Sequence, residues 1–222
     1  MNKGLFISFE GGEGAGKTTQ IQTLKTRLEN EGHYVLLTRE PGGTPEAEKI
    51  RDLLVKREGG NWDGMTELLL FYAARRHHVE TLIKPALAEG KIVICDRFSD
   101  STHAYQCYGH GVSHDAFEKI DALVIDGFKP DITFLLDVPV DIGLKRSKRV
   151  NDDTQVLSEA EIEDRFERLD SSFHGKLRQG FLTIAKDNPA RFCVIDALQT
   201  PEAISTIIQD KALNTLKVGA NV

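Results

Sequence analysis

A glycine-rich segment, residues 9–20 with the sequence FEGGEGAGKTTQ, carries the residues best suited to chemistry. Gly11, four further residues, and then Gly16, Lys17 and Thr18 match the spacing of a phosphate-binding loop. In such a loop, consecutive backbone N–H groups turn toward phosphate oxygens, and the helix that follows points its positive dipole end at the same anion. Lys17 is expected to reach the terminal phosphates and Thr18 to bind Mg²⁺. A glycine-rich turn without a ligand is the alternative, but the apolar run before the loop and the amphipathic stretch after it favour the phosphate site.

A second cluster, CDRFSDSTHAYQ at residues 95–106, directly follows an apolar run. At the end of a strand, Asp96 can hold a metal-bound water, and Arg97 can bind a phosphate through two parallel hydrogen bonds. An ordinary surface ion pair is the alternative. Because ligands of α/β proteins bind beyond the carboxyl ends of the strands, the position favours the functional interpretation.

Two further clusters allow both a functional and a structural interpretation. In LLLFYAARR, residues 68–76, Phe71 and Arg75 share a helix face, so an aromatic plane and a guanidinium can hold a nucleobase between them. The pattern alone favours a core phenylalanine and a solvated arginine. KRSKR, residues 145–149, is either a solvated helix face or a lid that closes over donor phosphates and neutralises charge on the transferred group. The pattern does not choose between these two.

Composition narrows the classes of partner. The chain has 222 residues and a net charge of −6, so a general basic surface for a nucleic acid polymer is absent and anions are bound by local clusters. None of its three cysteines shows metal-ligand spacing, and their number indicates a reducing cytosol. The first apolar run, LFISF, is too short for a signal peptide or a membrane span. We expect a soluble cytoplasmic protein.

The chain alternates between strand and helix patterns. Short apolar runs at 5–9, 34–38, 92–96, 132–138 and 192–196 predict buried parallel strands. Between them lie helical patterns: one carries Ile21, Leu24 and Leu28 and ends at Gly32, one opens at Thr44, one runs over 65–83 and restarts or kinks at Pro85, and the last starts at Thr200. Ser158 and Glu161 predict a capping box for a long charged helix through 166–185. This pattern predicts an α/β fold in one domain, residues 1–222, with a phosphate-binding loop at 11–18 and a lid at about 143–165.

The loop alone indicates only that a nucleotide binds. A GTPase switch is disfavoured because the sequence contains no DxxG turn and no NKxD base-reading loop. A helicase or motor usually has a longer chain and further nucleic-acid surface. The three clusters favour instead a second, smaller anionic substrate, and therefore a small-molecule kinase.

Taken together, FEGGEGAGKTTQ, TREPGGT, LLFYAARR and CDRFSDSTHAYQ closely resemble the thymidylate kinases, specifically their bacterial form, over nearly the whole chain. The resemblance implies a P-loop fold with a five-stranded parallel sheet flanked by helices and a mobile basic lid. It implies transfer of the γ-phosphoryl group of ATP to dTMP with Mg²⁺ as cofactor, and a homodimer. The residues implied for ATP are Gly11, Gly12, Glu13, Gly14, Ala15, Gly16, Lys17, Thr18 and Thr19, with Thr18 and Asp96, the latter through water, on the metal.

The resemblance also assigns roles on the acceptor side. Phe71 stacks on the thymine ring, Arg75 reads its edge, and Thr102 and Gln106 complete base recognition. Tyr105 crowds the 2′ side of the sugar, and Glu13 faces the sugar or the acceptor. Arg97 and Arg51 hold the acceptor phosphate, and Glu40 lines the same pocket.

The resemblance leaves the catalytic cation open. Some family members place an arginine within the phosphate-binding loop and others supply it from the lid; here the loop carries Glu13, so the cation comes from elsewhere. The candidates for this cation are Arg146, Lys148, Arg149 and Arg165. The other residues assigned to catalysis are Lys17, Asp96 and Arg97. The chain departs from the pattern of the bacterial relatives in the acidic stretch NDDTQVLSEAEIE after the basic segment, so the resemblance does not choose among these cations.

Two alternatives to a dTMP kinase stay open. One is a kinase for another deoxynucleotide or for a deoxynucleoside; a neutral nucleoside would give Arg97 and Arg51 no phosphate to hold. The other is an ATP-dependent binding protein without transfer activity, against which the presence of Lys17, Asp96 and Arg97 argues.

Overall fold

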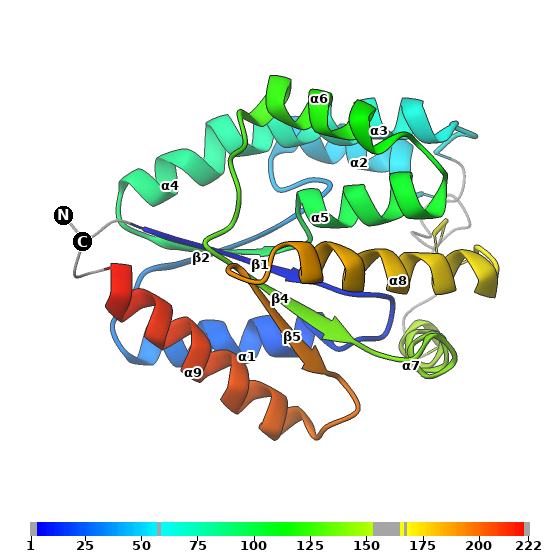
Figure 1. Ribbon diagram of the computed structural model, residues 1–222. Coiled ribbons are helices and arrows are strands. Elements are labelled where there is room, and N and C mark those ends of the chain that lie inside the picture. Colours follow the sequence, from blue (N-terminus) through cyan, green and yellow to red (C-terminus); the bar gives the residue numbers. More distant parts are fainter. Residues whose placement is uncertain (1–3, 57–58, 153–164, 167, 220–222) are drawn as a thin grey trace.

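Five apolar segments form one parallel sheet, as the sequence predicts. The strands are β1 (Leu5–Glu10), β2 (Val35–Arg39), β3 (Ile92–Asp96), β4 (Ile132–Asp137) and β5 (Phe192–Asp196). They lie in the order β2-β3-β1-β4-β5, and every neighbouring pair is parallel. Because all the strands are parallel, their carboxyl ends meet at one edge of the sheet (Figure 1). The computed structural model describes residues 4–56, 59–152, 165–166 and 168–219.

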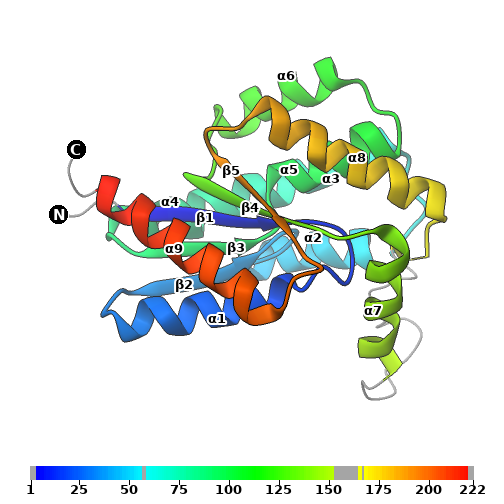
Figure 2. The same cartoon turned by 60° about the horizontal axis from the view of Figure 1, so that its bottom comes forward.

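Helices α1 (Lys17–Asn30) and α9 (Pro201–Gly219) cover one face of the sheet (Figure 2). Ile21, Leu24 and Leu28 of α1 are buried in the core that α1 and α9 share with the strands, because their spacing puts them on one side of the helix. The helix ends before Gly32, which has a φ of 87°. Both the buried face and the glycine stop were predicted, as was the start of α9 after Thr200.

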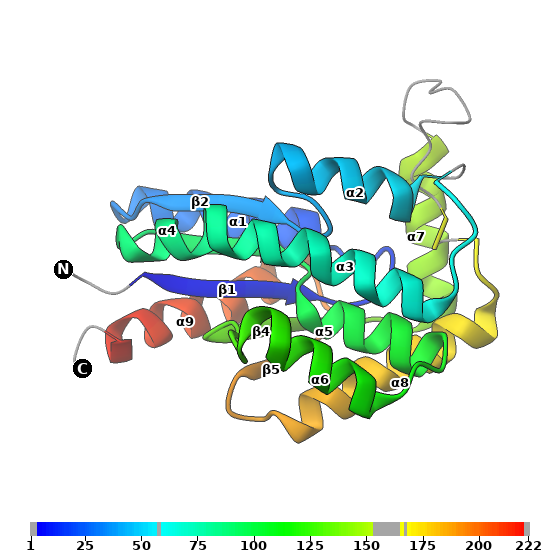
Figure 3. The same ribbon diagram turned by 90° about the horizontal axis from the view of Figure 1, so that it is seen from above.

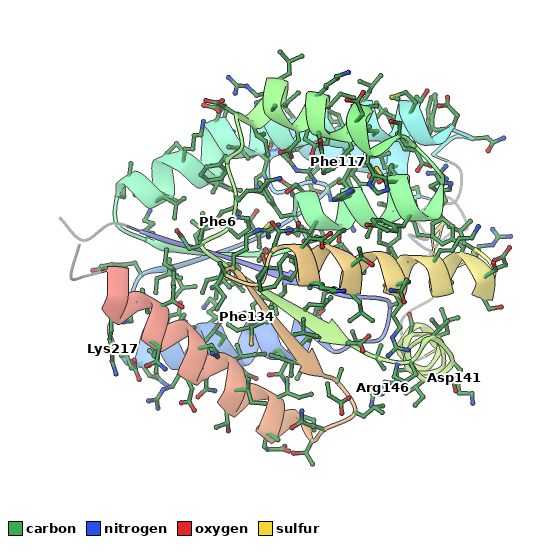
Figure 4. All side chains as sticks on the ribbon, viewed as in Figure 1. Phe6, Phe117, Phe134, Asp141, Arg146 and Lys217 are labelled. Atoms are coloured by element: carbon green, nitrogen blue, oxygen red, sulfur yellow. The ribbon has the colours of Figure 1, made fainter. Side chains whose placement is uncertain are left out.

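The opposite face is covered by α3 (Gly64–His78), the π-helix η1 (Val79–Ile83), α4 (Lys84–Ala88) and α6 (His114–Ile125) (Figure 3). Phe6 and Phe117 belong to the core on this side, whereas Phe134 belongs to the core beneath α1 and α9 (Figure 4). The predicted restart at Pro85 is confirmed, since α4 has this proline in its first turn. The irregular turn itself lies in η1, which ends at Ile83, just before the helix that contains Pro85.

The remaining helices gather at the carboxyl ends of the strands. They are α2 (Pro45–Val55), which Thr44 caps as predicted, α5 (Ser99–Thr102), the π-helix η2 (His103–Gly109), α7 (Val140–Asp152) and the start of α8 (Ser171–Asp187), whose later turns pack against β4 and β5. The loops between these helices and the strands carry the sequence motifs, so the fold brings the motifs together. No helix within the described ranges has the length and apolarity needed to cross a membrane.

One helix prediction needs correction. The helix expected to run through residues 166–185 begins only at Ser171, and residues 165, 166 and 168 form turns. Asp170 takes an extended backbone conformation, and its carboxylate accepts a 2.8 Å hydrogen bond from the N–H of Phe173, which caps a new helix there. The capping-box residues Ser158 and Glu161, and most of the lid, lie outside the described residues.

Candidate active site

The phosphate-binding loop joins β1 to α1 and folds around the amine of Lys17. Gly11, Gly14 and Gly16 have φ values of 137°, 64° and 91°, which residues with a side chain rarely adopt. A Cβ at Gly14 would also collide with a backbone carbonyl of α7. Lys17 is buried, and its Nζ donates to the carbonyl oxygens of Gly11 and Gly12 at 3.2 Å each. The loop thus holds a positive charge within its own backbone turn.

Arg97 follows β3 directly and connects this loop to the next helices. Its φ is 67°, a strained value for a residue with a side chain and a frequent mark of a functional position. Nη1 donates to the Gly11 carbonyl at 2.9 Å and to the Ser101 hydroxyl at 3.1 Å, while Nη2 donates to Glu13 Oε1 at 2.8 Å. The guanidinium carbon also lies 5.4 Å from the centre of the Tyr105 ring. These contacts of the side chain hold Arg97 in its strained backbone conformation.

Charges around Glu13 are closely balanced. Burial by itself raises the pKa of Glu13, but the positive charges of Arg97 and Lys17 and a 2.8 Å hydrogen bond from the Tyr105 hydroxyl bring it below its ordinary value. Burial lowers the pKa of Lys17, and repulsion from Arg97 lowers it further, with partial compensation from Asp96 and Glu13. Two cations held this close favour the approach of an anion such as a phosphate.

Arg75 extends from α3 into a buried polar cluster and is only 1% exposed. Its Nε donates to Glu40 Oε2 at 2.7 Å, and its Nη2 donates to Thr102 Oγ1 at 2.9 Å. The other oxygen of Glu40 is bonded to Nδ1 of His78 at 2.9 Å. Burial lowers the pKa of Arg75, but the carboxylate of Glu40 together with other acidic groups nearby outweighs this effect and raises the pKa above its ordinary value. Nη1 of Arg75 is buried without a partner among the described residues.

A cavity of about 150 Å³ lies beside this cluster. It is lined by every residue that the sequence assigns to the acceptor: Glu13, Glu40, Arg51, Phe71, Arg75, Arg97, Thr102, Tyr105 and Gln106. Nε2 of Gln106 donates to Glu67 Oε2 at 2.9 Å, and Oε1 of Gln106 is buried without a partner in the described part of the chain. Among the buried polar atoms that lack partners in the described ranges, the wall of this cavity therefore contributes a donor, Nη1 of Arg75, and an acceptor, Oε1 of Gln106.

Phe71 satisfies both interpretations that its sequence context allows. It packs against Leu54 and Val55 in a small apolar cluster, as a core residue does. It also lines the cavity, and its ring centre lies 6.3 Å from that of Phe166. The core contacts fix the ring and leave part of it available to a flat ligand.

A second, larger cavity of about 700 Å³ opens over the phosphate-binding loop. Glu13 to Thr19 line it together with Asp96, whereas Gly11 and Gly12 lie behind it, where their carbonyls hold Lys17. The two cavities share four wall residues, namely Glu13, Glu40, Arg51 and Arg97. Oδ1 of Asp96 is buried without a partner in the described ranges, so it can accept from a ligand or a metal-bound water. A ligand in one cavity meets a ligand in the other at the shared wall.

The candidate cations of the lid lie in different places. Arg146 on α7 lines the larger cavity, and its Nη1 donates to the carbonyl of Ala197 at 3.0 Å (Figure 4). Arg165 lies instead on the acceptor side, where it donates to the carbonyl of Leu54 at 2.9 Å and forms a 2.5 Å ion pair with Glu67. The side chains of Lys148 and Arg149 lie outside the described residues.

Sequence reasoning missed several residues of the site. Phe98, Ser101 and Phe166 line the smaller cavity, and Glu10 holds the turn after β3 by accepting a 2.8 Å hydrogen bond from the N–H of Phe98. His174 on α8 lies behind the loop, with its buried Nε2 lacking a partner in the described ranges. Phe98 and Ser101 lie within the CDRFSDSTHAYQ motif, so their place near the site could have been predicted from the motif. The positions of Glu10, Phe166 and His174 depend on contacts between distant segments.

These features define a class of enzyme. A strand, a phosphate-binding loop and a helix form a nucleoside triphosphate site, and an arginine-walled cavity adjoins it at the carboxyl ends of the strands. This is the arrangement of a P-loop kinase that phosphorylates a small substrate.

Comparisons with known proteins identify the family. The family model described as thymidylate kinase matches residues 9–208. The chain is 44% identical over 214 residues to a thymidylate kinase of Trichlorobacter lovleyi, covering 96% of this chain and 99% of that protein. It is 45% identical over 216 residues to one of Caulobacter vibrioides, covering 97% and 99%. The crystal structure of thymidylate kinase from Ehrlichia chaffeensis superposes with a TM-score of 0.71 at 37% identity, covering 97% of this chain and 99% of that one.

The chain therefore belongs to the thymidylate kinase family, and the predicted family and fold are both confirmed. Its activity is the phosphorylation of dTMP to dTDP, with ATP as the phosphoryl donor. The alternatives of a kinase for another deoxynucleotide or for a deoxynucleoside, and of a binding protein without transfer activity, are set aside.

The buried Glu10 generates a testable pH dependence. Burial, and next the nearby charge of Asp100, raise the pKa of Glu10 from 4.5 to about 8. Between these two values the folded protein keeps a proton that the unfolded chain has lost, so the contribution to stability is complete below pH 4.5 and is lost as the pH rises through about 8. We expect the free energy of unfolding of the native protein, relative to that of Glu10→Gln, to fall over this range in urea titrations. A difference that is constant with pH would contradict the raised pKa.

Proposed function

We propose that dTMP occupies the smaller cavity and the triphosphate of ATP the larger one, so that the γ-phosphoryl group is transferred in line across their shared wall. The observation that carries this proposal is the pair of adjoining cavities with Arg97, Arg51, Glu13 and Glu40 between them. Phosphoryl transfer depends mainly on positioning and on charge stabilisation, and a common wall with two arginines supplies both.

The base is bound through complementary groups. Phe71 stacks on the thymine ring from its fixed place in the apolar cluster. The imide edge of thymine presents a carbonyl acceptor and an N–H donor, which match the unpartnered Nη1 of Arg75 and Oε1 of Gln106. Thr102 keeps Arg75 in place through their 2.9 Å hydrogen bond. Cytosine presents an amino donor and a ring-nitrogen acceptor on this edge, so the same site disfavours it.

The sugar and the acceptor phosphate lie toward the shared wall. Tyr105, anchored by its hydroxyl on Glu13, crowds the 2′ side of the sugar and favours deoxyribose. Arg97 and Arg51 bind the phosphate as charge-assisted hydrogen-bond donors. Arg51 already directs Nη1 to the carbonyl of Pro41 at 2.7 Å, beside Glu40, which lines the same wall.

The donor side carries the phosphates and the metal. Backbone N–H groups of residues 11–19 and the amine of Lys17 bind the triphosphate. Thr18 and Asp96 fit a Mg²⁺ ion, because both line the larger cavity and Oδ1 of Asp96 is a buried acceptor without a partner among the described residues. The ion would neutralise charge on the phosphate oxygens when bound.

Among the candidate cations we assign Arg146 to the transferred group, since it lines the larger cavity. Arg165 closes the acceptor cavity instead, through its ion pair with Glu67 and through its neighbour Phe166, whose ring centre lies 5.3 Å from that of Tyr105. Arg149 stays a candidate. The whole chain acts as one domain, with residues at about 143–165 as a lid.

Two further properties belong to the proposal. The chain forms a homodimer. The apolar side chains of Met65 and Leu69 on α3 and of Leu123 on α6 are exposed and would be covered by the second copy. Sedimentation equilibrium measures the mass of the assembly in solution. The protein works in the cytoplasm, consistent with three cysteines that form no disulfide, all within the described part of the chain.

The assignment of Arg146 predicts a split between two kinetic parameters. Arg146→Ala should lower kcat by about 10³-fold, because an arginine on the transferred phosphoryl group stabilises the transition state by this order. Arg165→Ala should mainly raise KM for dTMP, since this residue lies on the acceptor side. Steady-state kinetics with dTMP and ATP measure both values. An unchanged kcat in Arg146→Ala would move the role to another cation such as Arg149.

The assignment of Tyr105 predicts a change in sugar discrimination. Tyr105→Ala should raise kcat/KM for the ribose form of the substrate relative to dTMP by about 10-fold or more, because the ring no longer excludes the 2′-hydroxyl. Tyr105→Phe is the matched control, since it keeps the ring and removes only the hydrogen bond to Glu13. Equal discrimination in the native protein and in Tyr105→Ala would exclude this role.

A further inference from the structure

Three potential metal ligands converge away from both cavities. His103 and Cys107 come from η2, and His114 is the first residue of α6. One ligand atom from each side chain lies within 4.8 Å of the other two. Nε2 of His103 and Nδ1 of His114 are 2.8 Å apart. None of the three residues lines the acceptor cavity or the cavity over the phosphate-binding loop.

The surrounding aromatic residues hold these side chains in place. The ring of His103 stacks on Phe117 at a centroid distance of 4.2 Å and an angle of 11°. The ring of His114 meets Tyr108 edge to face at 4.9 Å. Cys107 is buried, and it stands four residues after His103 on a π-helical turn, a feature often found at functional positions. The donor atoms are therefore positioned by packing rather than by their own mutual hydrogen bond alone.

We propose that His103, Cys107 and His114 form a site for a Zn²⁺-like transition metal. Two imidazoles and one thiolate are a typical ligand set for tetrahedral Zn²⁺ and a poor one for Mg²⁺, which prefers oxygen. Since His114 is exposed, the fourth position is open to water. The two nitrogens, 2.8 Å apart, need to separate only to about 3.3 Å to bind one ion in tetrahedral geometry. The thiol of Cys107 loses its proton to solvent on binding.

The spacing of the cysteines does not predict this site, because two of its three ligands are histidines and one of these lies on the next helix. The site has a structural link to the reaction. Tyr105 and Gln106 stand between His103 and Cys107 on η2 and line the acceptor cavity. A metal that joins η2 to α6 would stiffen the segment from which both side chains reach the substrate.

Cobalt provides a direct spectroscopic test with untagged full-length protein that is free of metal and nucleotide. Titration with Co²⁺ should produce a thiolate-to-cobalt band in the near ultraviolet together with the intense visible bands of a tetrahedral site, and Zn²⁺ should displace both. Cys107→Ser should lose the near-ultraviolet band, and His114→Ala should weaken binding by about 100-fold or more. Co²⁺ bound by oxygen ligands near Thr18 and Asp96 would give neither signal.

Matched controls separate the site from general effects. Cys193→Ser and His33→Ala change a thiol and an exposed histidine elsewhere and should leave the titration unchanged. His114→Ala replaces an exposed residue and is expected to fold, which circular dichroism checks, and Zn²⁺ should raise the melting temperature of the native protein but not of this variant. The same cobalt spectrum in Cys107→Ser as in the native protein, or only a weak octahedral spectrum in the native protein, would overturn the proposal.

Discussion

The arrangement of the site depends on the guanidinium of Arg97, which joins two loops that are far apart in the sequence. It donates to the Gly11 carbonyl and to Glu13 in the phosphate-binding loop, and to Ser101 in α5, the helix that follows β3. These bonds hold a backbone with a φ of 67° that would otherwise relax. Since Arg97 lines both cavities, the same side chain sets the distance between donor and acceptor in the proposed arrangement of the substrates.

Buried polar contacts give this arrangement its rigidity. Arg75, Glu40 and His78 form a chain that His78 extends to the hydroxyl of Thr38, at 2.6 Å from Nε2. Removing one member of a buried ion pair typically costs about 3–5 kcal/mol, because the other charge stays buried without a partner. Three of the four buried side-chain groups without partners in the described part of the chain, on Arg75, Gln106 and Asp96, line the two cavities, and the fourth, on His174, lies behind the phosphate-binding loop. Most of these unpartnered groups therefore lie where a substrate or a metal would bind.

The sequence predicts most of this fold from local patterns, whereas the residues of the acceptor cavity follow from the resemblance to a family, because the pattern alone favours a core role for Phe71 and a solvated Arg75. Continuous apolar runs mark the five strands, and the motif residues converge at the carboxyl ends of these strands. The position of Arg165 was not predictable from the lid pattern. Its side chain donates hydrogen bonds to Leu54 and Glu67, on helices about 100 residues away in the sequence. The start of α8 was missed because Asp170 caps a new helix within a stretch that reads as continuous. The π-helical turn of η2 has no periodic apolar signal, so the meeting of His103 with His114 was visible only in three dimensions.

The most direct test of the account is the affinity of Arg97→Gln for dTMP and for thymidine, measured by titration calorimetry without ATP. The native protein should bind dTMP more tightly than thymidine, because the phosphate gains charge-assisted hydrogen bonds worth about 1.5–3 kcal/mol each. In the variant this preference should fall by about 10- to 100-fold while the affinity for thymidine stays nearly unchanged. A variant that keeps the full preference for dTMP would contradict the role of Arg97 as the link between the two substrates.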